Sequence, residues 1–238
     1  MAKEKRMSSL LKSSLEDLLR ERRLAAQAPP LRGEDRRLSP LPFGSPALDG
    51  LLAGGLPRGA LSEIHGPASS GRTGLAVALA ARATGRGALV AWVDPADRFD
   101  PAGAAESGMD LARCLWLRGG GTFGLPRALA ALGVVLGSGL FEAVVLDLAG
   151  VPADELYRLP GTSWIRLART IEDSPTALLV VAAAHVACGP GGVSLALAPA
   201  RAEWSGEPGP GRLLGALAGD ARAGRHAPRG AAFRLDAV

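Results

Sequence analysis

The sequence predicts an α/β fold built around a mostly parallel sheet. Between residues 60 and 184, short apolar segments alternate with segments that have the spacing of helices. The apolar segments are continuous runs, as expected for strands that are buried on both faces of a parallel sheet. A glycine-rich turn joins the first strand to the first helix, which is the layout of a phosphate-binding loop. The chain of 238 residues is long enough to bury a large core without disulfides or metals.

The predicted elements follow one another in a regular order. Parallel strands are expected at residues 60–65, 88–93, 114–117, 143–146 and 177–184. Helices are expected at residues 73–84, 126–136 and 164–172. After residue 184 the helical spacing stops, and three further strands are expected at 193–198, 213–218 and 231–235. We expect these three to join one edge of the sheet in antiparallel orientation, with glycine- and proline-rich loops at 189–192 and 205–211.

The first 37 residues are predicted to be an N-terminal basic helix and linker, followed by a core over residues 38–238. Residues 7–24 have helical spacing, and residues 28–33 then interrupt the chain as a linker does. The apolar positions of the helix include Leu11, Leu15, Leu18 and Leu19. Two interpretations remain open: the helix packs on its own domain, or it docks through these leucines on a neighbouring subunit or a partner.

The net charge of +4 is located in that N-terminal segment. Residues 1–37 contain 10 basic and 6 acidic residues, whereas residues 38–238 contain 17 of each. A nucleic-acid-binding domain that is basic over its whole surface is therefore disfavoured. Aromatic residues make up only 4% of the chain, which leaves few side chains on which bases could stack.

The composition predicts a cytoplasmic protein without a membrane segment. The two cysteines, Cys114 and Cys188, have neither the spacing of a metal site nor that of a disulfide framework. Such cysteine usage suits a reducing compartment. The first 25 residues carry charges throughout, and no apolar run reaches the roughly 18 residues of a transmembrane helix.

The glycine-rich turn has the pattern G-x-x-x-x-G-[K/R]-T. Its predicted nucleotide-binding residues are Gly66, Ser69, Ser70, Gly71, Arg72 and Thr73. Backbone N–H groups at the start of a helix point at bound phosphates, and glycines let the backbone come close to them. The Thr73 hydroxyl, together with Asp147 at the end of the 143–146 strand, is placed to hold Mg²⁺. The predicted cofactor is therefore ATP with Mg²⁺.

Arg72 departs from the usual form of this loop, which has lysine at that position. The lysine ammonium is a compact charge that reaches the β- and γ-phosphates. Arginine also binds phosphate, but its planar guanidinium is larger and does not fit the same niche. We therefore expect ATP and Mg²⁺ to bind weakly or not at all, and we expect hydrolysis to be impaired.

The chain resembles the RecA recombinase family over the region from about residue 38 to the C-terminus. The resemblance rests on residues 43–49 and 54–59 before the loop, residues 63–73 through it, and residues 93–101 and 108–111 after the second strand. It implies a RecA-like P-loop core. In that family an N-terminal helix joins adjacent subunits, and here residues 7–24 stand at the corresponding place.

The resemblance also implies defects in catalysis. Recombinases have a glutamate two positions after the second strand's final Asp, where it orients the attacking water, and this chain has Ala96 there. Loss of such a group costs about 10²–10⁴-fold in rate. Asp97 is one residue out of register, and the family's γ-phosphate-sensing glutamine is absent. His185 is the residue that could replace that glutamine, although a structural role for a lone histidine is the more ordinary interpretation.

The segments that correspond to the DNA-binding loops of recombinases look short and neutral. They are residues 147–178, with Arg158, Arg166 and Arg169, and residues 189–192. The core sheet is also expected to finish near the last residue, without a further C-terminal domain. This combination is most similar to the ImuA-type proteins, which are accessory factors of damage-induced (SOS) translesion mutagenesis. The resemblance implies partners such as the RecA-type recombinase or a translesion polymerase-like protein.

Three hypotheses follow. The first is an accessory protein with a degenerate nucleotide site, a pseudo-ATPase that acts through protein contacts. The second is a DNA-stimulated ATPase of the recombinase type, in which Arg72 replaces the lysine and Asp97 or His185 completes the site. The third is a weak single-stranded DNA-binding module that uses the basic N-terminal segment, whose few excess charges predict binding that moderate salt abolishes.

Overall fold

The computed structural model describes Ser13, Asp17 and residues 39–120, 124–187, 189–224 and 229–236. The predicted N-terminal helix and linker therefore lie outside the described residues, apart from these two isolated positions. The same holds for the predicted docking leucines, Leu11, Leu15, Leu18 and Leu19, and for Cys188. The division of the chain at residue 37 stays a prediction.

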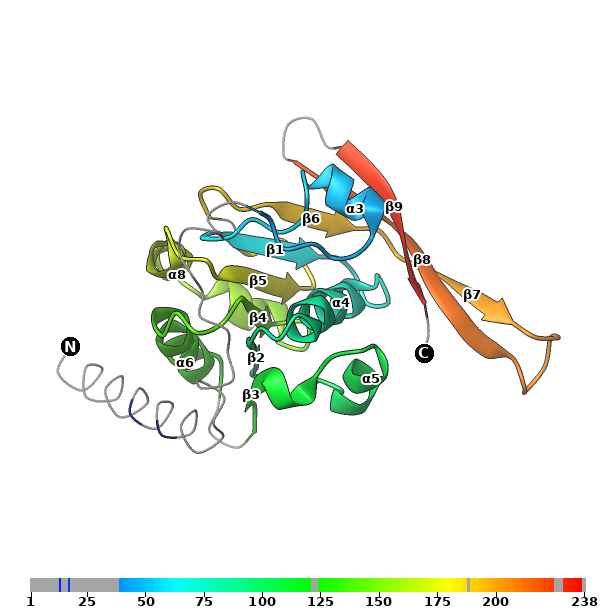
Figure 1. The fold of residues 1–238 in the computed structure, drawn as a ribbon, viewed down its shortest axis with the longest axis horizontal. Coiled ribbons are helices and arrows are strands. Elements are labelled where there is room, and N and C mark those ends of the chain that lie inside the picture. Colours follow the sequence, from blue (N-terminus) through cyan, green and yellow to red (C-terminus); the bar gives the residue numbers. More distant parts are fainter. Residues whose placement is uncertain are drawn as a thin grey trace.

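The core is a single mixed sheet with helices on both faces (Figure 1). Its strand order is β3-β2-β4-β5-β1-β6-β8-β7, with β9 also paired to β8. The first five strands are β1 (Leu61–His65), β2 (Val90–Asp94), β3 (Cys114–Arg118), β4 (Ala143–Asp147) and β5 (Ala177–Ala182). The last four are β6 (Ser194–Leu197), β7 (Arg201–Ser205), β8 (Leu213–Ala223) and β9 (Arg229–Asp236). The predicted α/β class with a mostly parallel central sheet is confirmed.

The central strands are parallel and fully covered. Every residue of β2, β4 and β5 is buried, as their continuous apolar sequences predicted. Their parallel pairing brings the carboxyl ends of neighbouring strands to one edge, where Asp147 lies opposite Val181 and His65 lies opposite Ala182. Ligands of open α/β sheets bind at this edge, so the arrangement of strands points to the place of the candidate site.

The prediction that all three C-terminal strands are antiparallel was wrong for β6. Strand β6 pairs in parallel with β1, whereas β8 pairs antiparallel with β6, β7 and β9. The chain reaches this position by turning back along β1, and glycine allows the close approach. A Cβ on Gly192 would lie 1.8 Å from the carbonyl oxygen of Leu61. The pattern of apolar and polar residues in the sequence does not distinguish this return path from a β-hairpin.

Helices form two layers on the sheet. On one face lie α3 (Pro46–Leu51), α4 (Arg72–Gly85) and α5 (Pro101–Glu106), and on the other lie α6 (Leu125–Gly137) and α8 (Gly161–Ile171) (Figure 1). The helix α7 (Ala153–Tyr157) and the 3₁₀ turn η1 (Leu111–Arg113) complete the set. The three long helices were predicted, but the short ones were not, because five or six residues are too few to reveal a helical period.

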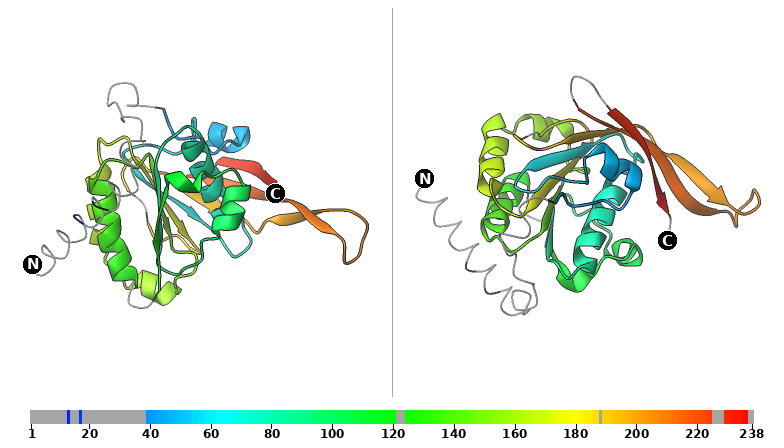
Figure 2. Two further views of the ribbon diagram at one scale, coloured as in Figure 1. Left: turned by 60° about the horizontal axis from the view of Figure 1, so that its bottom comes forward. Right: turned by 45° about the horizontal axis from the view of Figure 1, so that its top comes forward.

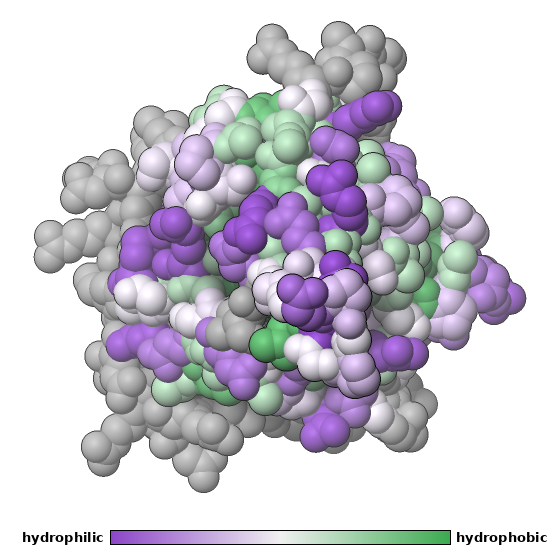
Figure 3. All heavy atoms as spheres, turned by 90° about the vertical axis from the view of Figure 1, so that its right-hand side faces the viewer, coloured by the Kyte–Doolittle hydropathy of each residue, from purple (hydrophilic) through white to green (hydrophobic). Residues whose placement is uncertain are grey.

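The C-terminal strands extend beyond the helical layers. Strands β7 and β8 project from the body as a long antiparallel ribbon (Figure 2). The ribbon exposes Trp204, Leu213 and Leu214, and the guanidinium of Arg212 lies 5.9 Å from the centre of the Trp204 ring. On the face that carries this ribbon, hydrophobic residues form small areas separated by hydrophilic ones (Figure 3). Among the described residues, no helix is long and apolar enough to cross a membrane.

Candidate functional site

The predicted nucleotide-binding residues form the turn between β1 and α4. Strand β1 ends at His65, and α4 begins at Arg72 after Gly71, which has a φ of 84°. Glycine adopts such a positive φ more readily than any other residue. Gly66 is equally constrained, because a Cβ there would lie 2.8 Å from the carbonyl oxygen of Leu197. The turn therefore has the backbone of a phosphate-binding loop, positioned at the start of a 14-residue helix.

The Arg72 side chain folds back over this loop. Its Nη1 donates hydrogen bonds to the backbone carbonyls of Gly66 and Pro67. Its Nε is buried without a hydrogen-bond partner, and so is the hydroxyl of Ser70. Burial lowers the pKa of the guanidinium, while attraction to Asp147 acts in the opposite direction. The charge that should meet a phosphate is thus engaged by the loop's own carbonyl groups.

Asp147 occupies the predicted metal-binding position at the end of β4. One carboxylate oxygen accepts a hydrogen bond from the backbone N–H of Ala149 at 3.0 Å. The pKa of Asp147 is raised to about 6, mainly by burial and in smaller part by the charge of the nearby Asp94, while the Ala149 hydrogen bond and Arg72 oppose the rise. A carboxyl group with this pKa is mostly ionised at neutral pH, and a bound cation would favour its charged form further. Thr73, the other predicted Mg²⁺ ligand, is the second residue of α4 and is partly exposed.

Asp94 shapes the turn that follows β2. Its Oδ2 accepts hydrogen bonds from the backbone N–H groups of Arg98 and Phe99, both at 2.8 Å, while its Oδ1 is buried without a partner. Ala96 lies in this turn and faces Gly150, on which a Cβ would be 2.8 Å from the Ala96 methyl group. The position that recombinases give to a catalytic glutamate is therefore a methyl group packed against the turn after β4.

The two residues that could have replaced the missing groups have other partners. Asp97 has a φ of 55° and its carboxylate pairs with the Arg118 guanidinium at 2.7 Å. His185 follows β5, and its Nδ1 lies 2.5 Å from Oε2 of Glu63. Sequence reasoning missed Glu63 and His65, the partners of His185 on β1. A glutamate inside an apolar strand was the signal that could have identified them.

The predicted DNA-loop region after β4 is largely helical. Residues 153–157 and 161–171 form α7 and α8, and Trp164 of α8 is buried in the core. Arg158 pairs with Asp154 at 3.0 Å, one helical turn away. Arg166 and Arg169 are exposed on α8. Trp164 therefore packs inside the protein and does not offer a surface for base stacking.

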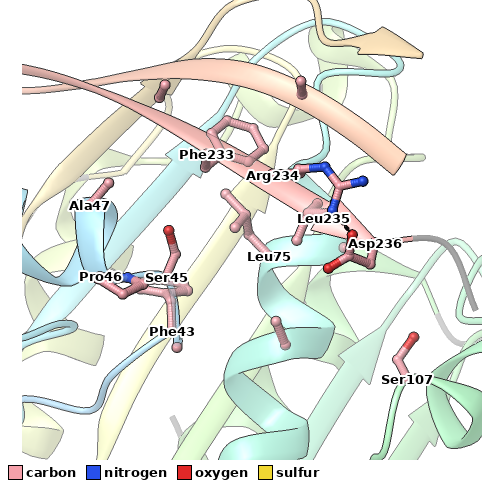
Figure 4. A pocket seen from close by; sticks show the side chains of 15 residues that line it. Phe43, Ser45, Pro46, Ala47, Leu75, Ser107, Phe233, Arg234, Leu235 and Asp236 are labelled. Atoms are coloured by element: carbon pink, nitrogen blue, oxygen red, sulfur yellow. Dashed lines mark hydrogen bonds and ion pairs between the residues drawn. The ribbon is translucent and has the colours of Figure 1, made fainter. Parts of the chain in front are cut away.

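A hollow of about 850 Å³ lies beside the first turn of α4, between α3 and β9 (Figure 4). Among the described residues that line it, Gly74 and Leu75 come from α4, and none belongs to the loop from Gly66 to Thr73. Strand β9 also packs against the loop itself, since a Cβ on Gly71 would lie 3.1 Å from the Phe233 ring. The sequence did not reveal that the last strand supports the phosphate loop.

Comparisons with known proteins agree with the site's layout. Residues 30–161, which include the loop, Ala96 and Asp147, match the model of the RecA N-terminal domain. Protein RecA of Paenarthrobacter aurescens is 37% identical over 140 residues, which are 57% of this chain and 40% of that protein. Protein RecA of Lactobacillus delbrueckii subsp. bulgaricus is 36% identical over 137 residues, 56% of this chain and 40% of that protein. For protein RecA of Chlorobium chlorochromatii the identity is 40% over 123 residues, 50% of this chain and 34% of that protein. The chain thus spans about two fifths or less of the length of these curated relatives.

Proposed function

Because the chain belongs to the RecA N-terminal domain family, we propose that it is a RecA-like accessory protein whose nucleotide site is degenerate and whose function depends on protein contacts. The observation that carries this proposal is the hydrogen bonding of the Arg72 side chain. Its guanidinium is hydrogen-bonded to the carbonyls of Gly66 and Pro67. To reach a phosphate it would have to give up these bonds, and a bond between a charged donor and a neutral acceptor is worth about 1.5–3 kcal/mol.

The chemistry of the site supports weak binding with little turnover. Bound ATP with Mg²⁺ would supply phosphoryl-transfer chemistry, and Thr73 and Asp147 are the residues that would hold the metal ion. Ala96 has no lone pair with which to orient water. Asp97 pairs with Arg118 at 2.7 Å, so using it for catalysis would require breaking that ion pair. We infer that nucleotide, where it binds, has a structural rather than a catalytic role.

The proposed biological role is DNA-damage (SOS) response and translesion mutagenesis in the cytoplasm. The partners we propose are the RecA-type recombinase and a translesion polymerase-like protein. The support is indirect: the altered catalytic positions, the helical segment after β4 and the similarity to the ImuA-type proteins. Contact with single-stranded DNA would be a minor, salt-sensitive contribution, because the excess positive charge lies in residues 1–37.

Two measurements separate this proposal from a recombinase-type ATPase. The first is ATP turnover by the full chain with and without single-stranded DNA, for which we expect no DNA-stimulated rate. Turnover that Asp147→Asn removes would overturn the proposal and favour the ATPase. The second is co-precipitation with the host recombinase and the polymerase-like protein, compared with a chain lacking residues 1–27. We expect the deletion to abolish partner capture, and equal capture would eliminate the docking-helix hypothesis.

A further inference from the structure

A second polar cluster lies immediately before the phosphate loop. Glu63 and His65 are two residues apart on β1, so their side chains project from the same face of the strand. His185 follows β5, the parallel neighbour in which Ala182 lies opposite His65. One ligand atom from each of these three residues lies within 4.8 Å of the others. Their donors are one carboxylate and two imidazoles.

Glu63 is held in a fixed orientation by the backbone. The side chain is completely buried, and its Oε1 accepts hydrogen bonds from the N–H groups of Val186 at 2.7 Å and Ala187 at 2.9 Å. The other oxygen, Oε2, points to His185 Nδ1 at 2.5 Å and lies 3.4 Å from the Ser194 hydroxyl. Metal-binding carboxylates commonly have this arrangement, in which outer hydrogen bonds orient the ligand and one oxygen remains for the metal.

The two histidines are positioned to share one ion with Glu63. Their ring centroids are 5.5 Å apart, with the ring planes tilted by 52°. A metal ion requires the nitrogen lone pair of a neutral imidazole, so an ion bound here would compete with protons for both histidines.

We propose that Glu63, His65 and His185 form a binding site for a divalent transition-metal ion of the Zn²⁺ type. Two imidazole nitrogens and one carboxylate oxygen are a common protein ligand set for zinc. Bonds of about 2.0–2.2 Å at tetrahedral angles place ligand atoms roughly 3.3 Å apart. Glu63 Oε2 and His185 Nδ1 now lie 2.5 Å apart, so an ion between them requires these two atoms to separate by about an ångström. The partly exposed His185 side chain is the one with space in which to move. His185 is 46% exposed, so the fourth position faces solvent and takes water.

Metal binding at this site would affect the phosphate loop. The ion would link the turn at residues 185–187 to β1, and His65 is directly followed by Gly66, the first residue of the loop. The same turn begins the return path to β6, which Glu63 otherwise holds through hydrogen bonds to Val186 and Ala187. The site thus joins two segments that lie far apart in the sequence. This inference does not depend on the proposed accessory function.

The test is titration of the full metal-free chain with ZnCl₂, monitored by calorimetry, together with thermal unfolding in the presence and absence of Zn²⁺. We expect one Zn²⁺ per chain. An ion that binds only the folded state at a hundredfold excess over Kd should raise Tm by roughly 5–10 °C. Co²⁺ should give the visible absorption bands of a site with nitrogen and oxygen ligands.

Because Glu63→Gln also disturbs the hydrogen bonds to the backbone, the informative variants are His185→Ala and His65→Asn. Each is expected to weaken Zn²⁺ binding at least about 100-fold.

Matched controls use the third histidine of the chain and one of its two cysteines. His226→Asn and Cys188→Ser should bind Zn²⁺ as the unaltered chain does. Loss of binding in Cys188→Ser, or a sulfur-to-cobalt absorption band, would overturn the proposed ligand set. Unchanged binding in His185→Ala, or absence of any Zn²⁺ binding and Tm shift in the unaltered chain, would overturn the site altogether.

Discussion

Buried charged side chains have different kinds of partner at the two edges of the parallel sheet. At the edge where the strands begin, Arg58 binds Glu142 at 2.6 Å and also donates to the carbonyl of Pro175 at 2.8 Å. The second oxygen of Glu142 has Arg86 at 3.6 Å, but it accepts no hydrogen bond. At the edge where the strands end, Arg72 turns to loop carbonyls, although Asp147 is near enough to affect its pKa. Ser70, Arg72 and Asp94 each keep a buried polar atom without a hydrogen-bond partner there.

We infer that the paired charges where the strands begin stabilise the fold, and that the charges where the strands end serve ligand binding. At the first edge the buried charges of Arg58 and Glu142 pair with each other and hold strands together. At the carboxyl edge, unsatisfied polar atoms cluster around the phosphate loop, where a ligand can satisfy them. The contrast also explains why the altered loop retains its shape. Glycines at 66 and 71 and the packing of Phe233 fix the backbone, and none of them depends on a lysine at position 72.

The largest expected effect is the loss of the structural pair. Arg58→Ala leaves Glu142 buried, with side-chain exposure of 2%, and without its closest cation. We expect the free energy of unfolding to fall by about 3–5 kcal/mol, measured by urea denaturation. The double variant Arg58→Met, Glu142→Leu should recover most of this loss, since it leaves no unpaired charge. Equal instability of the single and double variants would show that the contrast between the edges is wrong.

At the opposite edge, removing a charge should stabilise the protein. The pKa of Asp147 rises from 3.8 to about 6, so the folded state holds a proton that the unfolded chain has already lost. The charged form therefore costs stability increasingly from about pH 4 to pH 6, and up to about 3 kcal/mol above that range. Asp147→Asn should unfold at higher urea concentration at pH 7.5, with no difference at pH 3.5. A destabilised Asp147→Asn at pH 7.5 would contradict this assignment.

The smallest expected effect lies away from both edges. Gly133 is inside α6, and a Cβ there meets no atom within 4 Å. Gly133→Ala should raise the free energy of unfolding by about 0.5–1 kcal/mol, because alanine loses less backbone entropy in a helix. Gly192→Ala, at the tight return to β6, is the matched opposite and should destabilise. Thermal unfolding compares the two variants, and a change of Tm in the same direction for both would contradict the packing described.

The sequence predicts the regular part of this molecule better than the path of its chain. The strands β1 to β5 were recognisable as short, continuous apolar runs, and the helices α4, α6 and α8 were recognisable by the helical spacing of their apolar residues. The parallel placement of β6 was not, because it depends on close contact between Gly192 and Leu61, which are distant in sequence.

The part of the candidate site that is encoded in local sequence patterns was predictable. The loop from Gly66 to Thr73 and the strand-end Asp147 are local patterns with a known chemical use. The folding back of Arg72, the pairing of Asp97 with Arg118 and the cluster around Glu63 arise from three-dimensional contacts. Single residues such as His185 and Asp97 indicated possible roles, but only the packed structure reveals which partner each one has.

The most direct test of the degenerate-site proposal is equilibrium ATP binding, with Mg²⁺, to the unaltered chain and to Arg72→Lys. Lysine offers a compact ammonium in place of the guanidinium that is bonded to Gly66 and Pro67. We predict weak binding by the unaltered chain and affinity that is about 10- to 100-fold higher for Arg72→Lys, which corresponds to one charged hydrogen bond. Tight ATP binding by the unaltered chain that Arg72→Lys leaves unchanged or weakens would contradict the account.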